Sequence, residues 1–503
     1  MSPARLRTRH SVGRRDFLKA CGAAALFPYW PSALQEKCAG VSVNDIQTEM
    51  NPTCVARVVA INRPQEIAVE ILRARKDGIG VSIAGGRHAA GGQQFGSGTA
   101  LLDMRSCHGV RNFDSERGHI EVLGGTEWPE LMDFYLKAQE GRSCQWGIAQ
   151  KQGGLDWLTI GGTLSANAHG HALTMAPIVS DVASFELVDS QGNVQQCSRE
   201  KNAELFRLVI GGYGLFGVIS TVTLKLTPRQ KLMRQVEWAH SENVMSTFEK
   251  RVSQGYLYGD FQYSIDDSSE DFMRRGVLTA YGPARPGAGV SVEPHEFTEE
   301  EYLELLLLAH VNKREAFRRY AETCLASSGE VVWSDTHQLS PYPRFYHHVI
   351  DRRLRSAHPA TDPLTEVYVP REQLSDFLNE ARVEILRRRV SLVYGTVRLI
   401  ERDSETFLPW ARQNYACVIF TVHTEHTSEG EERTADAFRS LIDMARRRGG
   451  SYYLTYHRDA TRGQVTACYP QFSEFLHLKR KYDPDELFQS DWYRHYRDLF
   501  QKS

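Results

Sequence analysis

A glycine-rich loop is the part of this sequence whose residue types and spacing most clearly suggest chemistry. Six of the fourteen residues from Gly85 to Gly98 are glycine, against about one expected from average usage. Glycines allow positive φ and close backbone approach, so successive N–H groups can turn inward and bind an anion such as a diphosphate. His88 lies in this loop, where it could be a nucleophile or a covalent tether, or could simply hydrogen-bond the backbone.

The common nucleotide motifs do not explain this loop. It lacks the Gly-Lys-Ser/Thr of a triphosphate-binding P-loop, and a predicted strand follows it where a Rossmann motif requires a helix. A literal GxGxxG occurs at Gly212–Gly217, but it leads into a predicted strand at 218–226, and no suitably placed acidic residue for a ribose follows. We therefore expect no nicotinamide Rossmann site.

Two further glycine segments follow the loop. The three segments read GGRHAAGGQQ at 85–94, IGGTLSANAHG at 160–170 and GGYGLFGVI at 211–219. In this order they resemble the FAD domain of the vanillyl-alcohol oxidase family of FAD-linked oxidases, which has a PCMH-type FAD-binding fold. The resemblance implies an FAD with the first loop on its pyrophosphate, the second segment beside flavin and pyrophosphate, and the strand at 218–219 near the adenosine end.

The resemblance also implies how the cofactor is held. His88 matches the position at which many members attach FAD covalently, whereas several subfamilies place other residues there and bind FAD without a bond. We expect FAD, attached through His88. The residues implied in cofactor binding are Gly85, Gly86, Arg87, His88, Ala89, Gly91, Gly92, Gly161, Gly162, Thr163, Ser165, Asn167, His169, Gly170, Gly217, Val218 and Ile219.

Cysteine and histidine spacing predicts no metal centre. The nine cysteines are an odd number without a close CxxC pair, so they indicate neither a zinc site nor a disulfide framework. Cys144 is the nearest candidate for a second flavin link of the berberine-bridge type, but it stands too far before the second glycine segment and is interpreted as structural. His423 and His426 do not supply three or four spaced ligands, and we expect no catalytic metal.

The C-terminal half resembles, more loosely, the sugar-oxidising branch of the family, namely alditol, aldonolactone and decaprenylphosphoryl-ribose oxidases. Segments 366–372 and 395–398 look like the cap strands of that branch, and 472–490 looks like its closing segment. Arg398 matches an arginine of the branch. Thr396, two residues earlier, stands where an acidic residue is usual, which departs from the polyol-binding arrangement.

The same resemblance implies catalytic residues near the flavin. A guanidinium from Arg398 would stabilise the reduced anionic flavin. In place of the branch's lysine segment this chain has TYHRD at 455–459, where Arg458 could offer a cation and His457 a base. Each arginine could instead form a structural salt bridge in the cap.

The implied function is FAD-dependent oxidation of a hydroxyl-bearing carbon in a carbohydrate, polyol, lactone or other alcohol. Hydride would pass to flavin N5, a base would take the hydroxyl proton, and oxygen or another acceptor would reoxidise the flavin. Two alternatives remain open at this point. One is a same-fold flavoenzyme with non-oxidative net chemistry, resembling alkyl-dihydroxyacetone-phosphate synthases, and the other is a non-catalytic exported binding protein.

These residues must be positioned by two α+β domains. We expect an FAD domain at 50–228, completed by 461–503, and a cap or substrate domain at 229–460 with an antiparallel sheet. Periodicity and capping signals predict strands at 81–84, 100–104, 119–123, 158–160, 182–188, 194–197, 218–226, 367–369, 392–399 and 418–422. They predict helices at 64–78, 202–210, from Thr298 through Phe317, and at 372–387, 434–448 and 471–482.

The N-terminal residues 1–33 are predicted to be a targeting signal and not a folded domain. Basic residues precede a weakly apolar stretch, and Arg14–Lys19 resembles the twin-arginine export motif. This predicts export by the twin-arginine machinery to the periplasm or outside the cell; the alternative is a disordered basic tail. A formal net charge of -2 over 503 residues argues against nucleic acid as the main partner.

Overall fold

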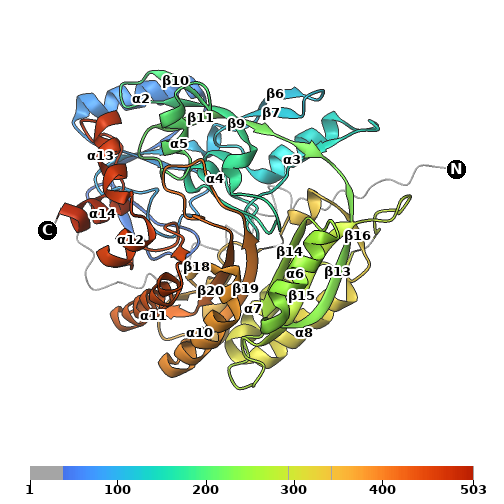
Figure 1. The fold of residues 1–503 in the computed structure, drawn as a ribbon. Helices are drawn as coiled ribbons and strands as arrows, with labels where there is room; N and C mark the ends of the chain where they lie inside the picture. The colour runs from blue at the N-terminus through green and yellow to red at the C-terminus, as the bar shows by residue number, and fades with distance from the viewer. Residues whose placement is uncertain (1–37, 293, 341, 502–503) are drawn as a thin grey trace. The chain divides into compact units, whose positions relative to one another are not determined.

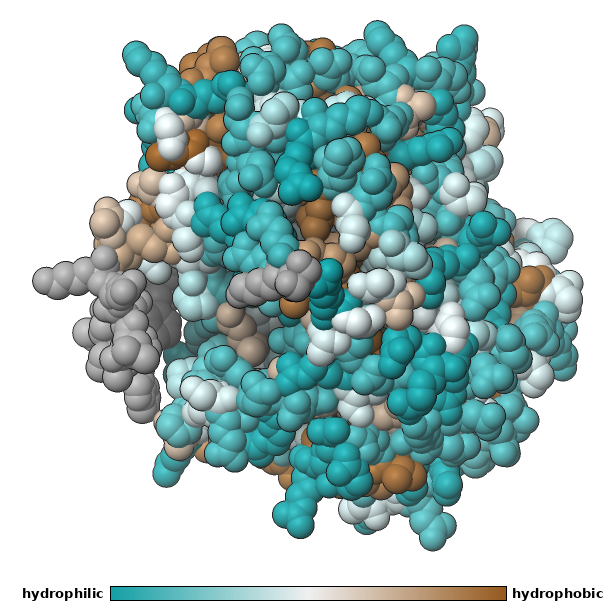
Figure 2. All heavy atoms as spheres, turned by 60° about the vertical axis from the view of Figure 1, so that its left-hand side comes forward, coloured by the Kyte–Doolittle hydropathy of each residue, from teal (hydrophilic) through white to brown (hydrophobic). Residues whose placement is uncertain are grey.

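The computed structural model describes residues 38–292, 294–340 and 342–501. The predicted export segment therefore lies outside the described residues. Residues from Gly40 onward form one compact unit, and every helix and strand of the described residues belongs to it. Its surface, on the face in Figure 2, is mostly hydrophilic with smaller hydrophobic areas between. The predicted α+β fold class is confirmed, because helices are combined with antiparallel sheets.

A small parallel sheet carries the glycine-rich loop. Its order is β3 (Arg57–Ala60), β5 (Ala100–Asp103), β4 (Val81–Ala84), and the loop connects β4 to β5. The predicted helix before β4 is confirmed as α2 (Pro64–Asp77), which starts at its proline and ends at Gly78 with a left-handed φ of 67°. Its buried side chains pack on this sheet.

A five-stranded antiparallel sheet forms the second layer. Its order is β10 (Val194–Ser198), β9 (Val182–Val188), β11 (Val218–Lys225), β7 (His119–Leu123), β6 (Val110–Asp114). The predicted hairpin is confirmed as β9 and β10. Helices α3 (Trp128–Ala138), α4 (Ile160–Ala166) and α5 (Ala203–Val209) connect these strands.

The strand predicted at 158–160 is wrong. Ile160 is instead the first residue of α4, because the Thr159 side chain accepts a hydrogen bond from Gly162 N and caps a helix there. The short apolar run alone did not distinguish a buried strand from a helix start.

An eight-stranded antiparallel sheet dominates residues 229–460 (Figure 1). Its order is β16 (Val331–Trp333), β13 (Lys231–His240), β15 (Arg275–Pro283), β14 (Tyr258–Tyr263), β19 (Leu392–Ile400), β20 (Tyr415–Val422), β18 (Leu364–Pro370), β22 (Ser451–Tyr452). The predicted strands at 367–369, 392–399 and 418–422 all lie within it. Short two-stranded pairs join β1 (Val41–Val43) to β2 (Thr53–Val55), β8 (Trp146–Gly147) to β12 (Thr227–Pro228) and β17 (Ala360–Thr361) to β21 (Thr424–Glu425).

Helices alternate along the chain with the strands of the large sheet. They are α6 (Val244–Ser253), α7 (Glu299–Val311), α8 (Lys313–Ala326), α9 (Tyr346–Leu354), α10 (Leu374–Arg388) and α11 (Ser428–Arg447). The Thr298/Glu301 capping box is confirmed at the start of α7. The helix predicted through Phe317 is in fact two helices, because Asn312 leaves helical geometry and its side chain caps α8 by accepting from Glu315 N.

The C-terminal chain returns to the small parallel sheet. After α12 (Arg462–Cys468) and α13 (Phe472–Tyr482), Val81 N donates to Leu487 O at 2.7 Å and Gln489 N donates to Val81 O at 2.8 Å. Residues 487–489 thus extend the sheet beside β4 before α14 (Asp491–Gln501) begins.

A disulfide corrects the cysteine prediction. Cys38 and Cys54 are both disulfide-bonded, although no CxxC spacing signals it. Among the described residues, Cys107, Cys197, Cys324, Cys417 and Cys468 are buried free thiols, and Cys144 is an exposed one.

Within the same described ranges, every helix is too short or too polar to cross a bilayer.

A buried ion pair holds the turn that brings the C-terminal chain back. Lys479 and Asp483 form it with side chains at most 1% exposed. Asp483 Oδ1 also accepts from Leu487 N at 3.0 Å, and Oδ2 accepts from Phe488 N at 2.8 Å. The carboxylate therefore fixes the backbone just where it joins β4.

Replacing Asp483 with asparagine is expected to lower the free energy of unfolding by about 3–5 kcal/mol, because Lys479 is left charged, buried and unpaired. Urea denaturation measures this change. Asp485→Asn is the matched control: Asp485 is 61% exposed in its pair with Arg75, so the change there should stay under about 1 kcal/mol. If the two variants were destabilised equally, the stabilising role given to the buried Lys479–Asp483 pair would be contradicted.

Candidate active site

The three glycine segments meet at one cavity, whose empty space of about 1050 Å³ includes space open to solvent. The glycine loop, α4, the start of β11 and the segment 453–456 line it. The predicted cofactor residues among its lining are Gly85, Gly86, Arg87, His88, Ala89, Gly161, Gly162, Thr163, Ser165, Gly217 and Ile219. Segments far apart in the sequence thus form the walls of a single site.

Glycine is required where the loop touches its neighbours. A Cβ added at Gly85 would lie 2.1 Å from Thr159 Oγ1, and one at Gly86 would lie 2.3 Å from Trp157 O. Side chains there would force the loop away from the segment that begins α4. Because these contacts are with backbone and a buried threonine, the cavity wall depends on glycine at both positions.

His88 is a neutral, unpartnered imidazole in the cavity wall. Neither ring nitrogen has a hydrogen-bond partner among the described residues. Burial and the nearby Arg344 lower the pKa of His88 to about 3. A buried polar group without a partner costs free energy, so the residue fits a position where a bound group completes its bonding.

Arg87 supports the loop from behind. It adopts a left-handed φ of 61° and its Nη2 donates to Asp103 Oδ2 at 3.0 Å. Asp103 ends β5, the strand after the loop. The pair therefore ties the loop to the sheet that carries it.

Six predicted cofactor residues are not in the cavity lining: Gly91, Gly92, Asn167, His169, Gly170 and Val218. Gly91 N donates to Thr455 O at 3.1 Å, which brings the 453–456 segment against the loop. Asn167 Nδ2 donates to Asp403 Oδ2 at 2.9 Å, and Val218 packs in the core beneath the sheet. These contacts brace the wall.

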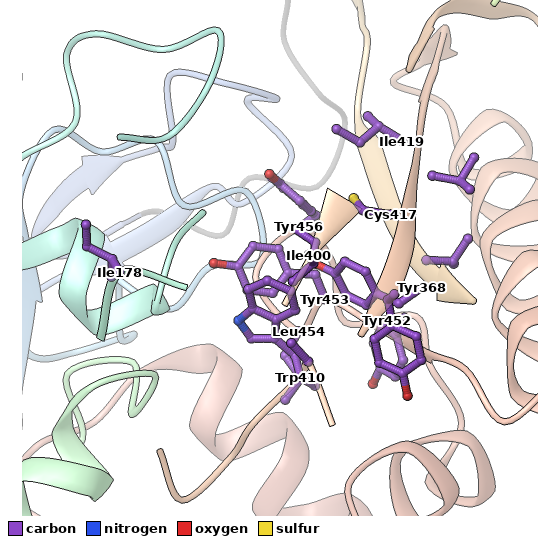
Figure 3. Packing of buried hydrophobic residues seen from close by; sticks show 14 of the residues in the cluster. Ile178, Tyr368, Ile400, Trp410, Cys417, Ile419, Tyr452, Tyr453, Leu454 and Tyr456 are labelled. Carbon is purple, nitrogen blue, oxygen red and sulfur yellow. The ribbon is translucent and has the colours of Figure 1, made fainter. Parts of the chain in front are cut away.

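A buried carboxylate lies next to the cavity on the side of the eight-stranded sheet. Glu366 on β18 is 1% exposed, and His169 Nε2 lies 2.8 Å from its Oε2. Tyr368 OH donates to Oε2 and Tyr456 OH to Oε1, both at 2.9 Å. Figure 3 shows Tyr368, Tyr456 and Cys417 gathered in this packed region.

The hydrogen bonds of Glu366 reach the cavity itself. Tyr456 lines the cavity and accepts from Gln152 Nε2 at 3.2 Å, and Gln152 lines it too. Burial raises the pKa of Glu366, but His169 and Arg398 more than offset this and hold it below its usual value. Glu366 is therefore a fixed negative charge behind the cavity wall.

Arg398 on β19 is a buried guanidinium with free donors. It is 8% exposed, and its Nε and Nη1 have no hydrogen-bond partner among the described residues. A Cβ at Gly153 would lie 2.9 Å from both of its Nη atoms, so the guanidinium lies against the backbone that follows Gln152. Gln152 lines the cavity, whereas Arg398 itself does not.

Asp260 on β14 completes this polar group. Thr396 Oγ1 donates to Asp260 Oδ2 at 3.3 Å. Burial raises the pKa of Asp260, and Arg398 and Arg234 oppose this only in part. A carboxyl that ionises with difficulty beside a cation is suited to taking up a proton.

The other two predicted catalytic residues lie elsewhere. His457 Nε2 is 3.0 Å from Thr365 Oγ1, and Thr365 precedes Glu366 on β18, so it faces the opposite side of the sheet. Arg458 Nη2 donates to Asn51 Oδ1 at 3.3 Å. Neither side chain lines the cavity.

Sequence reasoning missed Glu366, Asp260, Gln152 and Tyr456 as site residues. One signal was present: Glu366 and Asp260 are each the single acidic residue of a largely apolar or aromatic strand. An acid in such a strand needs a partner to be buried. Gln152 and Tyr456 gave no comparable signal.

Comparisons with known proteins agree with this geometry. Residues 55–198 match the family model described as FAD binding domain. The chain is 25% identical over 444 residues to cytokinin dehydrogenase 4 of Oryza sativa subsp. japonica, covering 82% of this chain and 79% of the relative. It is 24% identical over 441 residues to cytokinin dehydrogenase 5 of Arabidopsis thaliana, covering 81% and 77%.

A third relative, cytokinin dehydrogenase 7 of Oryza sativa subsp. japonica, matches a shorter segment at higher identity. It is 32% identical over 175 residues, covering 34% of this chain and 32% of the relative. These relatives are not sugar oxidases, so the predicted kinship with the sugar-oxidising branch is not supported. FAD fits the unpartnered His88 and the glycine-walled cavity. The chain is accordingly an FAD-dependent oxidoreductase with a PCMH-type FAD-binding domain at residues 55–198.

Proposed function

We propose that this oxidoreductase oxidises a hydroxyl-bearing carbon of a carbohydrate, polyol, lactone or other small alcohol. The observation that carries the proposal is the buried Arg398, two of whose guanidinium nitrogens, Nε and Nη1, lack acceptors among the described residues. Leaving buried donors unpaired costs free energy, and a substrate oxygen would supply the acceptor. A protonated amine would instead place a second cation beside the guanidinium.

The residues around Arg398 have separate roles. FAD, when bound, supplies the acceptor for two electrons. Arg398 orients the substrate oxygen and stabilises negative charge on it. A carboxylate oxygen of Asp260 takes the proton of the substrate hydroxyl. Glu366, fixed by His169, Tyr368 and Tyr456, keeps the guanidinium charge balanced. Oxygen or another acceptor then returns the enzyme to its starting state.

A second candidate substrate is a cytokinin, because the relatives are named cytokinin dehydrogenases. Glu366 and Asp260 are acceptors that could receive an N–H group. In this alternative Arg398 would have to be neutralised by the two carboxylates rather than bind substrate. The remaining predicted residues, His457 and Arg458, have no part in either proposal.

We also propose export through the twin-arginine machinery to the periplasm or outside the cell. The basic and then apolar order of residues 1–33 supports it. The disulfide bonding of Cys38 and Cys54 supports it independently, because disulfides persist mainly in oxidising compartments.

His88 is proposed as the covalent attachment point of FAD. Acid-precipitated wild-type protein should keep its yellow colour in the pellet, whereas His88→Ala should release it to the supernatant. His108→Ala is the control, since His108 is half exposed and paired with Glu130, and it should behave as wild type. Colour retained by His88→Ala would refute the tether, and so would free flavin released from wild type.

The substrate proposal is tested by following the flavin absorbance of the anaerobic enzyme after adding candidate substrates. One group of candidates is sugars, polyols and lactones, and the other is cytokinins. Bleaching by the first group is expected. Arg398→Met should keep bound FAD and lose roughly 10²–10³-fold in kcat/KM. Arg402→Met, at an exposed position four residues on, should lose little. Bleaching by cytokinins alone, with Arg398→Met unaffected, would favour the second candidate.

A further inference from the structure

A cluster of two histidines and a carboxylate lies away from the cofactor cavity. His310 near the end of α7, Asp362 between β17 and β18, and His423 between β20 and β21 form it. His310 Nε2 is 3.2 Å and His423 Nδ1 is 3.1 Å from the same oxygen, Asp362 Oδ1. The His310 and Asp362 side chains are at most 4% exposed, and His423 is 25% exposed. None of the three lines the cavity.

The surroundings fix which atoms face inward. His310 Nδ1 lies 2.7 Å from Leu306 O; a carbonyl only accepts, so Nδ1 carries a proton and a neutral ring presents the Nε2 lone pair to the cluster. Tyr346 OH donates to Asp362 Oδ2 at 2.6 Å, which leaves Oδ1 for the histidines. Outer partners that fix the ring tautomer and the carboxylate in this way are typical of metal ligands.

The spacing suits a small divalent ion. Zinc bonds to nitrogen and oxygen at about 2.0–2.1 Å in tetrahedral sites, which places neighbouring ligand atoms about 3.3 Å apart. Two of the three separations are 3.2 and 3.1 Å, and all three ligand atoms lie within 4.8 Å of one another.

We propose that His310 Nε2, Asp362 Oδ1 and His423 Nδ1 bind a divalent transition-metal ion, with Zn²⁺ the best match and water as the fourth ligand. Two imidazoles and one carboxylate are ligands that zinc accepts readily. The ion would join α7 to the edge where β17 pairs with β21. It takes no part in the oxidation proposed above.

The chain offers a matched control. Glu49, His347 and His348 also group together, with Nε2 of His348 3.1 Å from Glu49 Oε1. The two histidines of that group are consecutive on α9, which restricts how they can converge on one ion. A substitution at His348 therefore removes a histidine from a second cluster of the same composition.

The test is metal content after stripping the full-length protein with a chelator and dialysing it against Zn²⁺. Mass spectrometry of the metal should find about one zinc per chain in wild type and in His348→Gln. His423→Gln should lose it. Thermal unfolding should show a zinc-dependent rise in Tm for wild type that His423→Gln lacks.

Three results would overturn the site: wild type that retains no zinc, His423→Gln that retains as much as wild type, or zinc lost only from His348→Gln. Circular dichroism of each variant shows that loss of metal is not loss of fold. Because the readouts are metal content and Tm, they are independent of whether the proposed substrate is correct.

Discussion

The charge of Glu366 is the constraint on which the active site depends. A carboxylate that is 1% exposed is stable only with partners that replace water, and its partners come from distant parts of the chain. His169 follows α4, Tyr368 is on the same strand as Glu366, and Tyr456 lies on the segment that follows β22. Satisfying this one group therefore fixes the second glycine segment against the large sheet.

The cavity follows from the same packing. The 453–456 segment that supplies Tyr456 also accepts a hydrogen bond from Gly91 N through Thr455 O, so this segment holds the glycine loop from one side. From the other side, Gly85 and Gly86 lie directly against the residues that start α4. The free space between these walls, with the unpartnered ring of His88 facing it, is what remains for FAD.

Local signals predicted much of the fold. Pro64 and Gly78 mark the ends of α2 as expected, and the Thr298/Glu301 capping box marks the start of α7. Errors arose where one side chain decided the outcome: Thr159 turns an apolar run into a helix start, and Asn312 divides one predicted helix into two.

The site was predictable only in part for a related reason. Glycine-rich loops are recognisable from local sequence, and they do line the cavity. The partners of Glu366 are brought to it by the tertiary fold and not by local sequence: His169 and Glu366 are 197 positions apart. His457 is adjacent in sequence to the cavity-lining Tyr456, yet it contacts Thr365 on the opposite face of β18. Motif matching treats the two neighbouring residues alike and cannot show that they lie on opposite sides of the sheet.

The most direct test of FAD binding at this cavity is cofactor content, measured by the visible spectrum of the purified protein and by titration with added FAD. Wild type should carry flavin bands at about one FAD per chain. Gly86→Val should fold but lack them, because a Cβ there would lie 2.3 Å from Trp157 O and displace the cavity wall. A colourless wild type that also fails to take up FAD would contradict the assignment of the cavity, as would a Gly86→Val variant that binds FAD like wild type.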